Sequence, residues 1–221
     1  MKIVVKMEMV NDKKFNEIVS ILENKYKNVG YYLNFKTPID LLVAAILSPQ
    51  TRDTTINKLT PKLFENYHTA ADYAHADKAE LLSYISSVTF ANPKAERIIE
   101  ACRIVDEKYG GRVPDEKEDL LKLPGIGEKT AVTILINAYG KVEGIPVDTW
   151  VIKLSERIGL ADSKNPDKIE EELKSKIDKK YWHNFAYILK EHGKELCGSI
   201  PHCSKCPLNG ICPKNGVTKS L

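Results

Sequence analysis

Helical periodicity constrains this chain more than any other feature, because it recurs along almost the whole length. Near the start, Phe15, Ile18, Ile21 and Leu22 stand at the 3.6-residue spacing of a single helix face. The same spacing, read together with the prolines and glycines that stop helices, predicts helices over residues 15–26, 39–47, 54–67, 78–86, 93–109, 120–123, 128–139, 166–177 and 181–194, and another that begins near residue 150. No alternating run is long enough for a sheet, so the predicted fold class is all-α.

Size and charge set wider limits. The chain has 221 residues, enough for one large or two small domains with a buried core. Its net charge of +3 is compatible with a polyanionic partner but does not by itself indicate one. The longest apolar run, Leu41 to Leu47, falls short of the roughly 18 residues that suggest a membrane span. We therefore expect a cytoplasmic protein with no membrane partner, whose five cysteines are reduced.

Four of these cysteines lie together near the end of the chain, in a segment rich in proline and glycine. Cys197, Cys203, Cys206 and Cys212 are spaced C-x5-C-x2-C-x5-C. Structural zinc sites usually draw their ligands from two short C-x2–4-C pairs, and this segment has only one. The wider outer gaps favour a [4Fe–4S] cluster, with zinc as the alternative that the spacing leaves open. Cys102 lies in an apolar helix and is interpreted as a buried small hydrophobe.

A second motif, Leu-Pro-Gly-Ile-Gly at 123–127, joins two of the predicted helices. Pro124 stops the first helix, while Gly125 and Gly127 allow positive φ and the close approach of another backbone. Free N–H groups at the start of the next helix, with its positive dipole end, make an anion site for which DNA phosphate is the natural ligand. A phosphate loop of the Gly-Lys-Thr type is excluded, because a glutamate separates the last glycine from Lys129. On its own, the motif is equally compatible with a plain tight turn.

Two charged residues stand at helix starts near this motif. Lys129 lies in the first turn after the hairpin, where the positive helix dipole and partial burial would favour a neutral, nucleophilic amine. The simpler interpretation is a surface lysine that contacts solvent or phosphate. Asp148 directly precedes the helix that begins near residue 150 and is an expected N-cap. The same position also suits a carboxylate partner for the lysine.

Together these motifs resemble the endonuclease III family of helix-hairpin-helix DNA glycosylases. The resemblance rests on Leu-Pro-Gly-Ile-Gly-Glu-Lys-Thr-Ala at 123–131, on Val-Asp-Thr at 147–149 and on the four-cysteine tail. Two further segments are similar to the loops that the family inserts into DNA. Leu-Ser-Pro-Gln-Thr-Arg-Asp at 47–53 resembles the glutamine loop, and Val-Thr-Phe-Ala-Asn-Pro-Lys-Ala at 88–95 resembles the wedge loop.

The resemblance implies two helical domains that flank a DNA-binding cleft. A six-helix domain would span residues 31–141, and a discontinuous domain would combine 1–30 with 142–221 and carry a [4Fe–4S] loop at 197–212. The implied enzyme removes damaged bases, expected to be oxidised pyrimidines, from double-stranded DNA and then cleaves the abasic site by β-elimination. It is expected to be a monomer that associates with the nucleoid by binding DNA.

The resemblance also assigns roles to individual residues. Lys129 would be the nucleophile that forms a Schiff base, and Asp148 its carboxylate partner. The tail cysteines Cys197, Cys203, Cys206 and Cys212 would be the cluster ligands. The residues expected to contact DNA are Gln50, Arg52, Phe90, Lys94, Gly125, Ile126, Gly127, Thr130 and Lys205.

Three positions depart from the family pattern. The first cysteine gap is five residues where many members have six, Trp150 stands where many carry histidine, and Phe90 replaces a common leucine. Two other functions stay open at this point. One is a mismatch glycosylase, on the same scaffold, that removes uracil or thymine opposite guanine. The other is a non-enzymatic helix-hairpin-helix DNA-binding protein with a structural zinc site.

Overall fold

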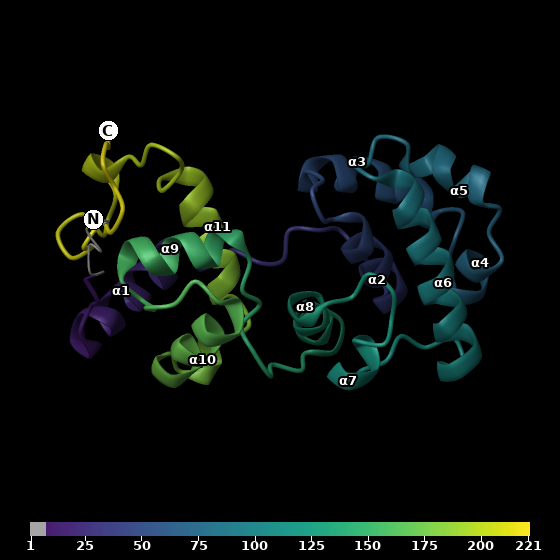
Figure 1. The fold of residues 1–221 in the computed structure, drawn as a ribbon, viewed down its shortest axis with the longest axis horizontal. Helices are drawn as coiled ribbons and strands as arrows, with labels where there is room; N and C mark the ends of the chain where they lie inside the picture. Colours follow the sequence, from purple (N-terminus) through teal and green to yellow (C-terminus); the bar gives the residue numbers. More distant parts are fainter. Residues whose placement is uncertain (1–7) are drawn as a thin grey trace, which may run out of the picture. The chain divides into compact units, whose positions relative to one another are not determined.

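The computed structural model describes residues 8–221, and every regular element in that range is a helix (Figure 1). The all-α fold class is therefore confirmed. The elements are α1 (Asp12–Lys25), α2 (Pro38–Leu47), α3 (Asp53–Phe64), α4 (Ala70–Ala74), α5 (Lys78–Ile85), α6 (Ala91–Tyr109), α7 (Lys117–Leu120), α8 (Glu128–Tyr139), α9 (Thr149–Ile158), α10 (Pro166–Lys176) and α11 (Phe185–Glu195), with 3-10 turns η1 (Lys179–Tyr181) and η2 (Cys203–Lys205). None of the described helices is long and apolar enough to cross a bilayer.

Helix α4 was not predicted, because five residues are too few to show an apolar repeat. Its start is nonetheless encoded locally. The Thr69 hydroxyl accepts a hydrogen bond from the Asp72 amide, and the Asp72 carboxylate accepts one from the Thr69 amide. The same reciprocal pair, formed by Thr37 and Asp40, begins α2. Helix starts of this kind depend on caps of about 1 kcal/mol each rather than on apolar rhythm.

The described residues form two compact units, which we describe one at a time. The first is Tyr32–Glu143 and carries α2 to α8. The second, here called the discontinuous unit, combines the described residues up to Tyr31 with Gly144–Leu221 and carries α1 and α9 to α11. The domain bounds expected above stay a prediction, since a compact packing unit is not by itself a domain that folds alone.

Helix α2 forms the centre of the Tyr32–Glu143 unit. Its residues from Ile39 to Leu47 are all buried, which explains why the sequence there is apolar on nearly every face. Helices α3, α6 and α8 pack against it (Figure 1). Each fully buried Leu, Ile or Val side chain contributes roughly 1.5–3 kcal/mol to folding. Cys102 on α6 is fully buried, as its apolar surroundings predicted.

The apolar core of the discontinuous unit joins residues from distant parts of the sequence. Phe15, Ile18 and Leu22 of α1 share one buried cluster with Leu154 of α9 and Ile188 of α11. Helix α11 contacts both α1 and α9 (Figure 1). The start of α9 is therefore held by packing against segments far from it in the chain.

The cysteine-rich tail is attached to this core by Leu208, which is fully buried. The regular structure between residues 197 and 212 is limited to the single turn η2. Burying one leucine contributes roughly 1.5–3 kcal/mol, whereas ordering the backbone costs about 1–2 kcal/mol for each residue. The order of this segment therefore depends on bonds beyond apolar packing.

Candidate active site and metal centre

The predicted hairpin is present between α7 and α8. Gly125 adopts a φ of +89°, and a Cβ there would lie 3.3 Å from Cδ of Arg97 and 3.6 Å from the Ile46 side chain. The positive φ therefore favours glycine here, and a Cβ would in addition make a tight contact with the Arg97 side chain. Ile126 is buried, and its amide N–H donates to the Leu123 carbonyl at 3.1 Å. The DNA contact expected of Ile126 stays a prediction.

Gly127 differs from the expectation in a way that bears on ligand access. Its φ is −107°, so the expected positive φ is wrong, and a Cβ there would meet nothing within 4 Å. It is the N-cap of α8, and no side chain caps this helix start. The first-turn amides from Glu128 to the half-buried Thr130 therefore have no side-chain acceptor among the described residues. Open space in front of free amides is the arrangement that an anion needs.

Lys129 is the second residue of α8, and its side chain is exposed. The partial burial that we expected for it is therefore absent. Its position in the uncapped first turn of α8 is as predicted. Its neighbour Glu128 is engaged by Lys117 of α7 at 2.5 Å, and the Lys129 carbonyl accepts from the Thr133 hydroxyl at 2.8 Å.

Asp148 caps α9, as predicted. Its Oδ1 accepts from the amides of Trp150 at 2.8 Å and Val151 at 3.0 Å. Both cap hydrogen bonds use Oδ1, so Oδ2 takes no part in the cap. Lys129 belongs to the Tyr32–Glu143 unit and Asp148 to the discontinuous unit. Their pairing stays a prediction.

The two loops expected to enter DNA share an unusual backbone conformation. Gln50 has a φ of 58° and Phe90 a φ of 59°, both in the left-handed region that disfavours residues other than glycine. This conformation costs roughly 1–2 kcal/mol for each residue. Gln50 is exposed, and the Phe90 ring is 60% exposed despite its apolar character. Strain and exposed apolar surface of this kind persist where a function requires them.

Lys94 does not have the role that we predicted from its position beside the wedge loop. The side chain is only 2% exposed, and its ammonium group donates to the carbonyls of Leu47 at 2.7 Å and Pro49 at 2.6 Å and to Oγ1 of Thr51 at 3.1 Å. An ammonium group has three N–H donors, and all three are used. The expected phosphate contact is therefore wrong, because solvent and DNA cannot reach this nitrogen. Arg52 and Lys205, by contrast, are exposed.

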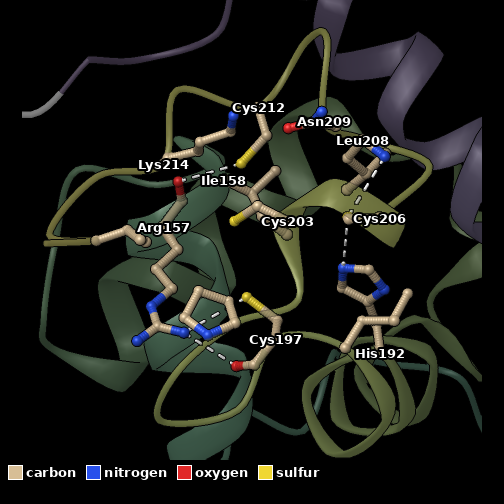
Figure 2. Close-up of a pocket in the computed structure, with 13 residues that line it drawn as sticks. Arg157, Ile158, His192, Cys197, Cys203, Cys206, Leu208, Asn209, Cys212 and Lys214 are labelled. Atoms are coloured by element: carbon tan, nitrogen blue, oxygen red, sulfur yellow. Dashed lines mark hydrogen bonds between the residues drawn. The ribbon is translucent and has the colours of Figure 1, made fainter. Parts of the chain in front are cut away.

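The four tail cysteines line a single pocket with a cavity volume of about 20 Å³. Figure 2 shows the sulfur atoms of Cys197, Cys203 and Cys212 directed toward the same space, with Cys206 on the opposite side of that space, next to His192. No three cysteine, histidine or acidic side chains between residues 8 and 221 converge closely enough to hold a single metal ion. The four thiols therefore line one pocket but do not converge on the position of a single metal ion.

Hydrogen bonds from neighbouring groups orient these thiols. Nη1 of Arg157 donates to the Cys197 carbonyl at 3.0 Å and lies 3.5 Å from the Cys197 sulfur (Figure 2). The Cys206 sulfur accepts from the Leu208 amide at 3.4 Å and lies 3.6 Å from Nε2 of His192. Burial raises the pKa of the Cys206 thiol, and it raises the pKa of Cys212 to about 11. Thiols buried in this way become thiolates readily only when a cation compensates their charge.

Comparisons with known proteins decide the family. Residues 43–179 match the model of the HhH-GPD superfamily base excision DNA repair protein. The chain is 40% identical to endonuclease III of Synechocystis sp. over 91% of this chain and 92% of that protein. It is 33% identical to endonuclease III of Escherichia coli K12 over 92% and 96% of the two chains. The chain belongs to the endonuclease III family.

Solved structures agree with this membership of the endonuclease III family. A trapped endonuclease III–DNA covalent intermediate matches with a TM-score of 0.88 at 32% identity, covering 93% of this chain and 97% of that one. A thermostable thymine-DNA glycosylase matches with a TM-score of 0.81 at 25% identity, over 92% and 97%. The protein is thus a base excision repair DNA glycosylase and abasic-site lyase. The mismatch and non-enzymatic alternatives are not favoured.

Sequence reasoning missed two residues that shape this endonuclease III site. Arg97 is exposed, and its Cδ lies against the hairpin at Gly125, so a basic side chain lies beside the hairpin. Nothing in the helical pattern distinguishes Arg97 from other surface residues of α6. The second is Gly193 of α11, where a Cβ would come within 2.3 Å of the Trp150 ring. A glycine inside an apolar helix is a signal of close packing that the sequence did contain.

Proposed function

We propose that this protein removes oxidised pyrimidines from double-stranded DNA and cleaves the resulting abasic site by β-elimination. One observation carries the proposal: a chain of the endonuclease III family places an exposed lysine, Lys129, in an uncapped first helical turn. A solved relative is an endonuclease III–DNA covalent intermediate. A covalent adduct with the substrate is the signature of nucleophilic catalysis, for which a lysine amine is a suitable group.

The damaged nucleotide must leave the base stack before Lys129 can reach its sugar. Extrusion costs a few kcal/mol. Phe90 and Gln50 fill the gap that the extruded nucleotide leaves, and their exposure on strained loops suits insertion. The free amides at the start of α8 bind a phosphate of the same strand and set the register, without reading the base sequence.

The chemistry then follows from one amine and one carboxylate. The neutral amine of Lys129 attacks C1′, and the bond from C1′ to the base breaks as the base leaves with a proton. The sugar opens to a Schiff base with the lysine. Loss of a proton from C2′ expels the phosphate at C3′. Water then hydrolyses the Schiff base and frees the Lys129 amine. Asp148, through the oxygen that its helix cap leaves unused, stabilises positive charge on the sugar and assists proton transfer.

We further propose that the four tail cysteines hold a [4Fe–4S] cluster. A single zinc ion would need its sulfur ligands within about 4 Å of one another, whereas no three of these thiols converge closely enough to hold one ion. The pocket that they line has apolar walls from Ile158 and Leu208. Four thiolates are also the usual ligand set of such a cluster. When bound, the cluster would tie residues 197–212 together and present Lys205 to the DNA backbone.

The cluster proposal predicts a brown protein with broad absorbance in the visible range and about four iron atoms for each chain. Replacing Cys203 with alanine should remove the colour and make the tail susceptible to proteolysis, while replacing the buried Cys102 should leave the colour unchanged. A colourless protein that contains one zinc ion for each chain would refute the proposal.

Borohydride trapping on duplex DNA with an abasic site tests the catalytic proposal. The wild-type protein should form a covalent adduct, and Lys129→Gln should form none. Lys122→Gln is a matched control, because Lys122 is an exposed lysine of the same hairpin, paired with Asp119 at 2.6 Å. If Lys129→Gln cleaves abasic DNA as fast as the wild type, Lys129 is not the nucleophile.

A panel of duplexes tests the choice of lesion. The expected order is oxidised pyrimidines first, with uracil or thymine opposite guanine processed more slowly. The reverse order would favour a mismatch glycosylase; one solved neighbour is a thermostable thymine-DNA glycosylase. We also propose that the protein acts as a monomer in the cytoplasm, associated with the nucleoid through DNA. Sedimentation with and without a lesion duplex tests the monomer.

A further inference from the structure

The buried ammonium group of Lys94 lies at the junction of the two loops that carry Gln50 and Phe90. Two of its three acceptors lie on the N-terminal side of Gln50: the carbonyl of Pro49 directly precedes it, and that of Leu47 is three positions before it. The third acceptor, Oγ1 of Thr51, directly follows Gln50. The ammonium group therefore binds the backbone before Gln50 and the side chain of the residue after it, and Gln50 is the residue whose φ is left-handed.

The same hydroxyl group also reaches the second loop. Oγ1 of Thr51 accepts from the amide of Thr89 at 3.2 Å, and Thr89 immediately precedes Phe90. Lys94 belongs to the first turn of α6, where its own amide donates to the Phe90 carbonyl at 3.2 Å. A continuous chain of hydrogen bonds thus runs from the Gln50 loop through Thr51 and Lys94 to both sides of Phe90.

A charged group is an unusual choice for this buried position. Burial, together with the nearby guanidinium of Arg97, lowers the pKa of Lys94 to about 8. A methionine would fill the same space without that opposition. A methionine, however, has no donor for the three oxygen atoms, and buried carbonyls without a partner are costly. The ammonium group is suited to this place because it donates to acceptors in the Gln50 loop, while its own residue belongs to α6, the helix that follows the Phe90 loop.

We infer that Lys94 joins the Gln50 and Phe90 loops into one preformed, two-pronged wedge, so that both side chains enter the base stack as a unit. This inference rests on the proposed function and names Lys94 as a positioning residue for nucleotide extrusion. Preforming the wedge lowers the entropic cost of inserting two side chains, because the loops are ordered before DNA arrives. Lys94 itself touches neither DNA nor the reacting sugar.

Two variants separate positioning from a general loss of structure. Lys94→Met removes all three donors while keeping the volume of the side chain. Thr51→Val removes the shared hydroxyl but leaves Lys94 in place, and Thr51→Ser restores the hydroxyl as a matched control. Thermal unfolding followed by circular dichroism establishes that each variant is folded at the assay temperature.

Two substrates separate extrusion from chemistry. Duplex DNA with an oxidised pyrimidine requires extrusion, whereas an abasic site in single-stranded DNA does not. We expect Lys94→Met and Thr51→Val to lower kcat/KM on the duplex by at least tenfold. Borohydride adducts on the single strand should stay within twofold of the wild type, and Thr51→Ser should behave as the wild type on both substrates.

A third readout needs no chemistry. 2-Aminopurine placed opposite a stable abasic analogue brightens when the wedge unstacks it. The wild-type protein should produce this rise, and Lys94→Met should lose most of it. The inference would be overturned if folded Lys94→Met produced the same fluorescence rise as the wild type or processed the duplex at the wild-type rate. An equal fall in activity on the duplex and on the single strand would overturn it as well. If the wild type forms no adduct on any DNA, the proposed function fails, while the fluorescence still tests the wedge.

Discussion

Replacing Gly193 with alanine should destabilise the discontinuous unit, although alanine is the better helix former. In an exposed helix this change stabilises by about 1 kcal/mol. At residue 193, however, the new Cβ would lie 2.3 Å from Cε3 and 2.7 Å from Cζ3 of Trp150. Carbon atoms pack best at about 3.5–4.0 Å, so the ring must move by more than about 1 Å.

The Trp150 ring has little room to move. It packs against the apolar core of its unit, and the Lys153 ammonium lies 4.9 Å from the ring centroid on one face. Overpacking of this kind costs about 1–3 kcal/mol. Subtracting the gain in helix propensity of about 1 kcal/mol leaves a net loss of up to about 2 kcal/mol for Gly193→Ala. Since the amide of Trp150 also binds Asp148, a shift of the ring should disturb the carboxylate as well.

A double-mutant cycle makes the reasoning testable. Urea unfolding, followed by far-UV circular dichroism on protein with identical metal content, gives the free energy of unfolding for each variant. In the Trp150→Ala background the clash is gone, so Gly193→Ala should now stabilise by about 1 kcal/mol. The effect of the same substitution should therefore change sign between the two backgrounds. A stabilising effect in both backgrounds would refute the packing argument.

Three further predictions concern Asp148, Lys94 and Lys205. Asp148→Asn should keep the cap of α9 and hold the free energy of unfolding within a few tenths of a kcal/mol, but it should abolish abasic-site incision. Asp148→Ala should abolish incision and also lower the free energy of unfolding in urea by about 1 kcal/mol. Incision by the Asn variant would show that the charge of Asp148 is not needed. Lysine NMR should find the pKa of Lys94 near 8, and Arg97→Gln should raise it. Because unfolded lysine titrates near 10.4, the folded protein binds fewer protons between about pH 8 and 10, so its unfolding free energy should rise with pH there, and Lys94→Met should lose that rise. Lys205→Gln should reduce the salt dependence of DNA affinity by about one unit of slope, and an unchanged slope would remove Lys205 from the interface.

Much of the fold follows from local pattern. Apolar spacing located most of the helices, and the all-round apolar character of residues 39–47 identified the buried helix α2. The Asp148 cap and the burial of Cys102 were also predicted correctly. These features depend on a residue and its close neighbours in the chain, whose preferences are written in the sequence itself.

The errors have a common cause of the opposite kind. Lys94 was expected on the surface because lysine is almost never fully buried without partners, and its partners come from a loop more than forty positions away. A positive φ at Gly127 was inferred from a turn motif, but which glycine needs positive φ depends on how the turn closes. Distant partners of this sort leave no mark in the local pattern.

The residue pattern was enough to establish an all-helical chain with a hairpin, an aspartate that caps a helix and four clustered thiols, because each of those features arises from residues close together in the sequence. Three-dimensional packing settled the rest: which lysine is exposed and which is enclosed, and how Trp150 lies on Gly193. It also showed that four thiols share one pocket. Those outcomes depend on the free energy of bringing remote segments together, and burial and hydrogen bonding acquire their values only once those segments meet.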